Sequence, residues 1–259
     1  MHSDRTCAHA QHGYSLIELM VAVAVALFLM GGALTIVQHT KYTFAAQNQL
    51  AQLQDNERMA MSLITDVVQS AGYFPNPHLF TSTTTLAGTP TLTDVSPNIG
   101  AATVAGAQGD TITVRYAAAS GDNVYNCRGD QYTGPNPFET WENTFSVVVV
   151  PGTPAGTPTQ YQLQCTLWSK SAGLQAATPL VIGVQKISIK YGLNNGAGGG
   201  SCANFYKAAG SMTATDWASI CSVKVTLTFA NPFNPPAGTK PTIDFTRVIA
   251  VMGAVGVSS

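Results

Sequence analysis

The sequence predicts an α+β protein in which one long N-terminal helix, apolar in its first half and amphipathic in its second, packs against an antiparallel β-sheet head domain. Two observations predict this class. An uncharged run between Glu18 and Lys41 is followed by an apolar stripe with helical spacing. After Pro77 the chain changes to short segments in which apolar and polar residues alternate, a pattern typical of half-buried antiparallel strands.

The apolar half of the predicted helix begins immediately after Glu18. Residues 19–37 read LMVAVAVALFLMGGALTIV, which is 19 residues and close to the roughly 20 that cross a bilayer as a helix. The preceding stretch, MHSDRTCAHAQHG, has one Arg and one Asp and so lacks the basic region of a secretory signal peptide. A plain membrane anchor would leave Glu18 unexplained, because a carboxylate at the membrane is costly and is usually paired or functional. The alternative is an ordinary helix-end carboxylate that reaches the lipid headgroups.

The amphipathic half, residues 43–72, carries one narrow apolar stripe. Its members recur at spacings of four and three: Ala46, Leu50, Leu53, Glu57, Ala60, Ile64, Val67 and Ala71. Glu57 interrupts the stripe, which predicts a seam that is not uniformly buried. Gly72, Pro75 and Pro77 predict the end of the helix. A free coiled coil is the alternative, but the stripe is short and a large β-rich region follows it.

The head, residues 73–259, is long enough for one sizeable core. Alternating segments predict half-buried strands at residues 111–116, 159–168, 184–191 and 223–229. Residues 145–150 and 245–252 are more continuously apolar, which predicts strands covered on both faces. Glycine-, proline- and asparagine-rich stretches at 152–158 and 194–201 predict loops. Since helices and strands do not alternate, a doubly wound fold is disfavoured.

The block GYSLIELMVAVAVALFLMGG resembles the N-terminal signature of type IV pilins and pseudopilins. In that family a short leader ends in Gly, a prepilin peptidase cuts before an aromatic residue, and the fifth residue of the mature chain is Glu. The resemblance implies that residues 1–13 are a leader, that cleavage falls between Gly13 and Tyr14, and that Tyr14 becomes N-methylated. Residues 14–42 would then be the transmembrane and filament-core half of the helix. Tyr14 replaces the usual Phe, and Thr35 stands where major pilins commonly have a proline.

The resemblance also implies an assembly role for Glu18. Cleavage would create a cationic amine on Tyr14, and the Glu18 carboxylate of the same or a neighbouring subunit could pair with it. Removing one partner of a buried ion pair costs about 3–5 kcal/mol, because the other charge is left stranded. Such a pair would set the register of subunits in a filament.

Within this family the chain is most similar to the PilW branch of the minor type IV pilins. The similarity rests on the N-terminal block, on QLAQLQDNERMAMSLITDVVQSAGYFP and on GDTITVRY. It implies a minor pilin that primes or caps pilus assembly, in support of pilus biogenesis, twitching motility, adhesion or DNA uptake. The implied partners are prepilin peptidase, other minor and major pilins, the inner-membrane assembly platform, membrane lipid and, as a further candidate, a tip adhesin. The implied location is the bacterial inner membrane with the head in the periplasm, and afterwards the pilus at the cell surface.

Two alternatives stay open. A minor pseudopilin of a type II secretion system would share the helix and much of the architecture. A membrane-anchored extracytoplasmic binding protein would use residues 1–40 only to hold its head at the membrane.

The cysteines predict disulfides in an extracytoplasmic head. Cys7 lies in the leader, and the other four form an even set: Cys127, Cys165, Cys202 and Cys221. Three connectivities are possible, and we favour the one that closes the shorter loops, Cys127 with Cys165 and Cys202 with Cys221. A zinc site is the alternative, but there is no CxxC, and the histidines that follow the leader are His39 and His78.

Charge and motifs disfavour other functions. With 12 basic and 13 acidic residues and no basic run, the chain lacks the electrostatic footprint of direct nucleic-acid binding. No GxSxG, HExxH or phosphate-loop sequence occurs, so we expect neither an enzyme nor a cofactor. Glu139 and Glu142 flank Trp141 and are expected in a solvated loop rather than in acid–base chemistry.

Two further groups have a structural and a functional interpretation. Four residues could offer oxygens to Ca²⁺, although their spacing matches no defined calcium loop: Asp122, Asn123, Asn126 and Asp130. We therefore predict no metal site. Four aromatic residues could line a contact face, but core or loop packing is the commoner role: Tyr125, Tyr132, Trp141 and Trp168.

Overall fold

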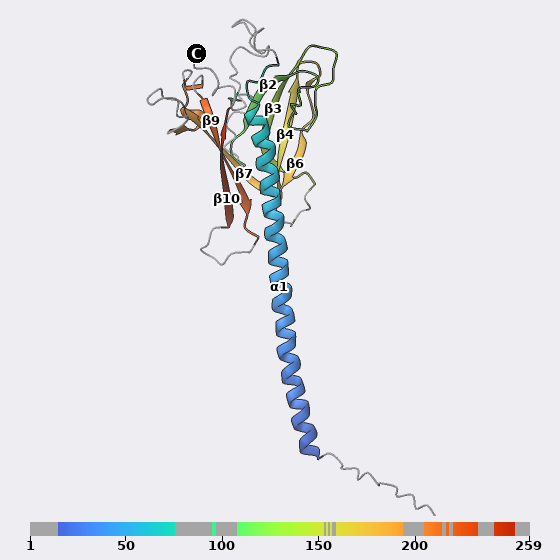
Figure 1. Ribbon diagram of the computed structural model, residues 1–259. Helices are drawn as coiled ribbons and strands as arrows, with labels where there is room; N and C mark the ends of the chain where they lie inside the picture. The colour runs from blue at the N-terminus through green and yellow to red at the C-terminus, as the bar shows by residue number, and fades with distance from the viewer. Residues whose placement is uncertain are drawn as a thin grey trace, which may run out of the picture. The chain divides into compact units, whose positions relative to one another are not determined.

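The computed structural model describes residues 15–75, 95–96, 108–152, 154, 156, 159–193, 205–213, 216–217, 220–232 and 241–251. The chain divides into two compact units, Met1–Leu50 and Ala51–Ser259. The predicted long helix is present: α1 runs from Leu16 to Gln69 and passes from the first unit into the second (Figure 1). Gly13, Tyr14 and Cys202 lie outside the described residues.

In the first unit α1 exposes its apolar side chains. Among the described residues, α1 is the helix that is long and apolar enough to cross a membrane, and none of its most apolar window is buried. Thr35, Thr40 and Thr43 each donate their hydroxyl to the carbonyl four residues earlier, at 2.8–2.9 Å. These bonds satisfy the hydroxyls within the helix itself. Unlike the proline common at this position in major pilins, Thr35 keeps its backbone N–H, and α1 continues past it.

In the second unit the apolar stripe of α1 becomes part of the core. Five of the predicted stripe residues are buried, as are two neighbours on the same side: Leu53, Ala60, Ile64, Val67 and Ala71, with Met61 and Val68. Glu57 is only half-buried, in agreement with an interrupted seam. Gly72 follows the helix with φ +74°, a left-handed conformation that favours glycine and ends helices.

The first sheet has six antiparallel strands. Its order is β1-β2-β3-β4-β5, and β6 also pairs with β4. The strands are β1 (Val95–Ser96), β2 (Ile112–Ala118), β3 (Glu139–Val149), β4 (Tyr161–Ser169), β5 (Gly173–Leu174) and β6 (Thr178–Ile182).

The second sheet has four antiparallel strands in the order β10-β9-β7-β8. They are β7 (Val184–Leu193), β8 (Tyr206–Lys207), β9 (Ile220–Ala230) and β10 (Thr242–Ala250), and a short 3₁₀ turn, Ala209–Ser211, follows β8. One face of this sheet is buried and apolar: Ile187, Ile189, Tyr191, Val223, Val225, Leu227 and Phe229. In Figure 1 β9 and β10 lie on one side of the head, and β4 and β6 lie on the other.

The described residues of the head therefore form two sheets rather than the single sheet that we expected. Backbone pairing between segments far apart in the sequence decides this division, and local alternation cannot reveal it. Contacts between β7 and both β3 and β4 bring the two sheets together. Asn56 of α1 also contacts this junction, because its side-chain amide donates to the Ile182 carbonyl at 3.1 Å.

Burial differs from prediction in three strands. All seven residues of β2 are buried, including Thr113 and Arg115, whereas a half-buried strand was predicted. The backbone after α1 runs along β2: Gly72 donates its N–H to Arg115 at 3.0 Å, and Ala117 donates to Tyr73 at 2.9 Å. With β3 on its other edge, β2 is an inner strand.

The two segments predicted to be covered on both faces are not. In β3 burial alternates, since Phe145 and Val147 are buried while Ser146 and Val148 are half-buried. Residues 245–250 belong to β10, which is the last strand in the order of its sheet, and Val248 is 52% exposed. A run of apolar residues shows what a strand contains but not its place in the sheet. Met252 lies outside the described residues.

Candidate functional site

Glu18 lies in the first turn of α1, on an exposed apolar surface. Its neighbours Ile17 and Leu19 are 72% and 61% exposed. Within the described part of the chain no cation forms an ion pair with Glu18. The Glu18 side chain is exposed and accessible to a group from outside the described part of the chain. The cleavage at Gly13, the methylation of Tyr14 and the assembly role of Glu18 stay predictions.

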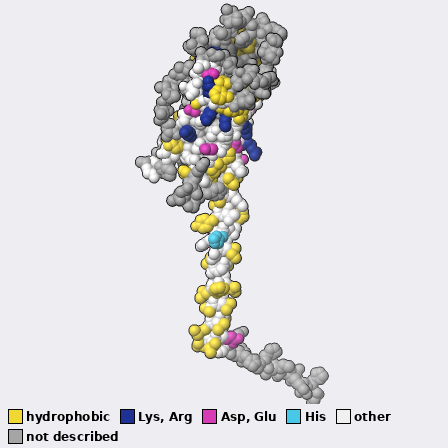
Figure 2. Space-filling model, turned by 90° about the vertical axis from the view of Figure 1, so that its left-hand side faces the viewer, with side chains coloured by type: hydrophobic (Ala, Val, Ile, Leu, Met, Phe, Trp, Pro, Cys, Tyr) yellow, Lys and Arg dark blue, Asp and Glu magenta, His cyan; other side chains and the backbone are white. Residues whose placement is uncertain are grey.

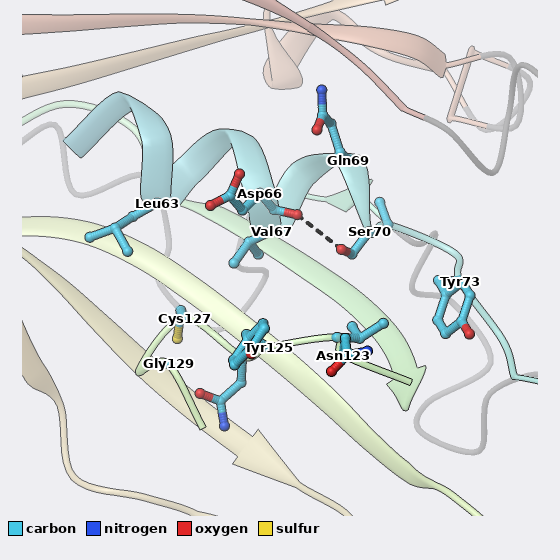
Figure 3. A pocket seen from close by; sticks show the side chains of 13 residues that line it. Leu63, Asp66, Val67, Gln69, Ser70, Tyr73, Asn123, Tyr125, Cys127 and Gly129 are labelled. Atoms are coloured by element: carbon cyan, nitrogen blue, oxygen red, sulfur yellow. Dashed lines mark hydrogen bonds between the residues drawn. The ribbon is translucent and has the colours of Figure 1, made fainter. Parts of the chain in front are cut away.

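A second candidate lies in the head, where α1 ends. A cavity of about 730 Å³ opens between the last turns of α1 and the loop of residues 119–138, which joins β2 to β3 (Figure 3). Leu63, Val67 and Ala71 of the α1 side give it an apolar wall. Tyr73 and Tyr125 also line it and are 37% and 52% exposed. Partial burial is the main cause that raises the pKa of Tyr73 above 10. The hydrogen bond to Asp122 and the negative charge of Asp122 add to this rise.

Asn126 organises the loop that forms the other wall. Its side-chain carbonyl accepts the backbone N–H groups of Arg128 at 2.9 Å and Asp130 at 3.0 Å. Its own backbone N–H donates to the Asp130 carbonyl at 3.0 Å, and Gly129 donates back to Asn126 at 2.9 Å. One buried asparagine thus closes a tight turn that a small polar side chain can stabilise.

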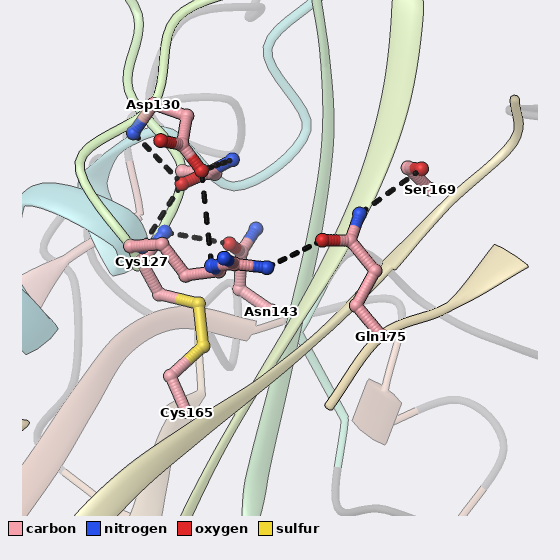
Figure 4. A network of polar contacts seen from close by, with 8 residues as sticks. Cys127, Asp130, Asn143, Cys165, Ser169 and Gln175 are labelled. Carbon is pink, nitrogen blue, oxygen red and sulfur yellow. Dashed lines mark hydrogen bonds and ion pairs between the residues drawn. A yellow bond between two sulfur atoms is a disulfide. The ribbon is translucent and has the colours of Figure 1, made fainter. Parts of the chain in front are cut away.

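A disulfide and a buried amide attach this turn to the first sheet (Figure 4). Cys127 is bonded to Cys165 of β4, with 6.3 Å between the Cα atoms and a sequence separation of 38, which is the pairing predicted from loop length. The Cys127 N–H donates to Asn143 Oδ1 at 2.8 Å, and Asn143 Nδ2 donates to the Val114 carbonyl at 3.4 Å. Asn143 has no exposed surface. Cys221 is also disulfide-bonded, but Cys202, its predicted partner, lies outside the described residues.

Three further hydrogen bonds support this part of the head. Arg128 donates from its guanidinium to the Gln175 side-chain carbonyl. Gln175 Nε2 in turn donates to the Ser169 hydroxyl at 3.5 Å. Tyr116 Oη donates to the Tyr125 carbonyl at 2.6 Å, and burial of the Tyr116 ring raises its pKa far above 10. The cavity therefore has one wall that is held in place by covalent and polar contacts.

The four candidate calcium ligands serve this loop instead. Asp122 Oδ2 accepts the Ala119 N–H at 2.8 Å, and Asn123 Oδ1 accepts from Gln131 at 3.3 Å. Asn126 makes the turn described above, and Asp130 lies 3.8 Å from the Arg128 guanidinium. Within the described ranges no three histidine, cysteine or acidic side chains are grouped to hold a metal ion.

Glu139 and Glu142 are in β3 and not in a solvated loop, so this prediction was wrong. Glu139 is 3% exposed, and its Oε1 accepts the N–H groups of Thr140 at 3.1 Å and Ser171 at 3.2 Å. Glu142 lies opposite Arg115 of β2. Burial raises the pKa of Glu142, and the Arg115 charge opposes that rise. Both carboxylates therefore interact with neighbouring groups of the fold: Glu139 through hydrogen bonds, and Glu142 through the charge of Arg115.

The aromatic residues divide between core and surface. Trp141 is buried and meets Tyr116 edge to face, with 5.9 Å between ring centroids, and Trp168 and Tyr132 are half-buried. Tyr125 is the exposed member, at the cavity. Core or loop packing therefore describes Trp141 well, whereas Tyr125 is available to a partner.

Sequence reasoning missed the roles of Asn126 and Asn143. Asn143 is an amide within a segment of strand-forming residues, and that position is the signal that could have indicated a buried hydrogen-bonding role. The sequence pattern pointed to Glu139 and Glu142 in this strand, whereas Asn143 makes the hydrogen bonds that hold the Cys127 loop.

Two family models match the chain. The model for Type IV Pilus-assembly protein W (PilW) matches residues 144–246, from within β3 into β10. The model for the prokaryotic N-terminal methylation motif matches residues 8–34, which include Gly13, Tyr14 and Glu18. The comparison with curated proteins and the comparison with solved structures found no match.

These matches agree with the two parts of the molecule. The methylation motif covers the apolar start of α1, as fits a membrane-anchored pilin that later enters the pilus. Together the prepilin signal and the PilW region imply interaction with prepilin peptidase and with other pilus components, and they indicate a structural protein. The chain is a PilW-like pilin related to the type IV pilus.

Proposed function

We propose that this chain is a minor type IV pilin, a structural subunit that primes or caps pilus assembly. The observation that carries the proposal is the placement of Glu18 in the first turn of an exposed apolar helix, inside the segment that matches the methylation motif. A helix that only anchored the head would gain nothing from a carboxylate at this position.

The proposed assembly step begins with cleavage between Gly13 and Tyr14. The new ammonium group on Tyr14 and the Glu18 carboxylate then pair between subunits whose apolar helices pack side by side. Burying an unpaired carboxylate in that apolar surrounding would cost several kcal/mol. The pair therefore favours one register of neighbouring helices over others, and lateral packing becomes directional.

We propose that the head contacts neighbouring pilins through its disulfide-held loop and the cavity at the end of α1. We propose that the head faces the periplasm before assembly and that its partners are other minor and major pilins, the assembly platform and, at the tip, an adhesin. The PilW match favours a pilus over a type II secretion pseudopilus.

Intact mass and N-terminal sequencing of the chain, purified from membranes and from sheared filaments, test this proposal. We expect loss of residues 1–13 and the addition of one methyl group to Tyr14. A bulky replacement, Gly13→Leu, should leave the full-length precursor in the membrane and serves as the control. An intact Met1 in cells that process their other prepilins would favour the membrane-anchored binding protein instead.

The number of filaments after gene deletion, together with their main component, distinguishes a minor from a major subunit. Deleting the gene for a minor pilin should reduce the number of surface pili, while the filaments that remain consist of another pilin. If this chain were instead the main component of purified filaments, the minor role would be wrong.

A further inference from the structure

The outer face of the second sheet carries three lysines, which we call the lysine face: Lys186, Lys190 and Lys224. Lys190 of β7 lies directly opposite Lys224 of β9, and Lys186 lies opposite Thr228 on the same face. Lys186 and Lys190 are exposed, and Lys224 is half-buried. Figure 2 looks onto the side of the head where β9 and β10 lie in Figure 1, and Lys and Arg side chains gather there.

Within the described part of the chain, none of these lysines has a carboxylate partner within ion-pair distance. Lys207 of β8 differs, since its ammonium group lies 2.8 Å from Asp216. Asp244 of β10 shares the outer face, but its carboxylate accepts the Thr228 hydroxyl at 2.6 Å. Lys224 contacts a ring instead, with its ammonium group 5.5 Å from the centroid of Tyr206.

The pairing of Lys190 with Lys224 is unfavourable for the isolated head. Residues directly opposite in an antiparallel pair have Cβ atoms roughly 5 Å apart, and like charges there destabilise the sheet. An acidic partner that covers the face would remove this repulsion. The arrangement thus stabilises a complex with an acidic surface relative to the separate head.

The remainder of the face carries several hydroxyl groups. Ser188 lies opposite Thr226, and the Thr226 and Thr246 hydroxyls are 2.9 Å apart. With strands roughly 5 Å apart and a rise of roughly 3.3 Å per residue, the three ammonium groups lie within the area of a small protein contact. Within the described part of the chain, the lysine face carries the ring of Tyr206, and Lys224 lies over it. Proteins that bind single-stranded nucleic acid instead present several open aromatic rings on which the bases stack.

We propose that the lysine face docks a carboxylate-bearing surface on the head of a neighbouring pilin subunit. This inference rests on the proposed function, because subunits that pack through their apolar helices hold their heads next to one another. A contact between two different surfaces propagates along an open helical assembly. Charge complementarity of this kind selects the neighbouring subunit and its orientation more than it adds affinity.

Carbodiimide cross-linking of isolated filaments that contain the full chain tests the contact directly. The reagent joins a lysine amine to a touching carboxylate as an amide, and the water removed converts the carbodiimide to a urea. Mass spectrometry should find Lys186, Lys190 or Lys224 joined to an Asp or Glu of another pilin. Cross-links that involve Lys170, which follows β4 of the first sheet, as often as these lysines would overturn the proposal.

Lys190→Glu separates docking from stability. The substitution places a carboxylate opposite Lys224, so the melting temperature of the full chain in detergent should stay equal or rise. Incorporation into filaments should nevertheless fall by about tenfold, because the docking surface loses its charge complementarity. The matched control, Lys170→Glu, changes an exposed lysine outside the second sheet and should incorporate like the wild type.

The outcomes separate this inference from the proposed function. Lack of processing or absence from filaments would contradict the proposed function itself. Normal processing together with wild-type incorporation of Lys190→Glu would overturn only the docking surface. Binding of double-stranded DNA or of phosphatidylglycerol vesicles that Lys190→Glu abolishes, without cross-links to another pilin, would assign the face to a different partner and would also overturn it.

Discussion

Gly109 lies against the backbone carbonyl of Ile187, and the two residues form a parallel bridge between the segment just before β2 and β7. Asp110 donates its N–H to the same carbonyl at 2.8 Å, and its Oδ2 accepts the Ile189 N–H at 2.8 Å. Ile187 donates its N–H to Gln108 at 3.2 Å. The first residues of GDTITVRY therefore join the two sheets of the head.

Gly109→Ala tests this junction. Gly109 has φ +88°, a backbone conformation that is strained for alanine. The added Cβ would also overlap the Ile187 carbonyl oxygen. We expect a loss of about 3 kcal/mol or more in the free energy of unfolding, because left-handed strain and overpacking against backbone add. Urea unfolding of the full chain in detergent, monitored by tryptophan fluorescence, measures this loss of stability.

Gly152→Ala is the matched control for backbone strain alone. Gly152 has φ +77° and no atom within 4 Å of an added Cβ. We expect a loss of about 1–2 kcal/mol. Equal losses for the two variants would mean that contact with Ile187 does not matter.

Asn143→Leu should destabilise the head by about 2–3 kcal/mol, because the buried Cys127 N–H would lose its acceptor. Gln175→Ala alters the more exposed end of the same network and should cost less than about 1 kcal/mol. Midpoints of chemical unfolding compare the two. A cost for Gln175→Ala that equals the cost for Asn143→Leu would contradict the assignment of Asn143 as the anchor.

Asp216 makes stability depend on pH in the acid range. The Lys207 ammonium group donates to its carboxylate at 2.8 Å, and Thr213 donates its backbone N–H and its hydroxyl, each at 2.8 Å. These bonds lower the pKa of Asp216 from 3.8 to about 2. Since the folded-state pKa is the lower one, the stabilisation is present above pH 3.8 and is lost as the pH falls toward 2.

Asp216→Asn should therefore remove part of the acid sensitivity. The difference in unfolding midpoint between wild type and variant should be largest above pH 4 and shrink toward pH 2, since other carboxylates titrate equally in both proteins. A difference that stays constant over this range would exclude the proposed protonation of Asp216.

Glu18→Gln should leave cleavage and membrane insertion normal and strongly reduce assembly, because it removes the charge and keeps the shape of the side chain. Counting surface filaments by electron microscopy, with intact mass as the check on processing, measures both. Asp55→Asn removes an exposed charge elsewhere on α1 and should assemble normally. Normal piliation by Glu18→Gln would remove the assembly role of this carboxylate.

Local patterns predict the elements of this protein well. The stripe from Leu53 to Ala71 becomes the buried face of α1 because every contact surface of a helix repeats with the helical period. Alternation predicts β4, β7 and β9 for the equivalent reason in strands. The preference for disulfides that close shorter loops predicts the Cys127–Cys165 pair, because the segment that carries Cys127 and β4 are close along the chain.

Relations between distant segments were not predictable in this way. The exposure of β10, the burial of both faces of β2 and the division into two sheets depend on which strands pair. The role of Gly109 depends on the approach of β7, and the role of Asn143 depends on the position of the Cys127 loop.

Hydrophobic periodicity and charge are properties of neighbouring residues, so the amino-acid order is enough to show that a carboxylate begins an apolar helix and that an amphipathic segment leads into a β-rich head. Strand pairing in the folded chain places Lys190 opposite Lys224, anchors the disulfide loop on Asn143 and brings Gly109 to the junction of two sheets. These relations depend on register, which joins residues tens of positions apart, and no local pattern encodes that choice.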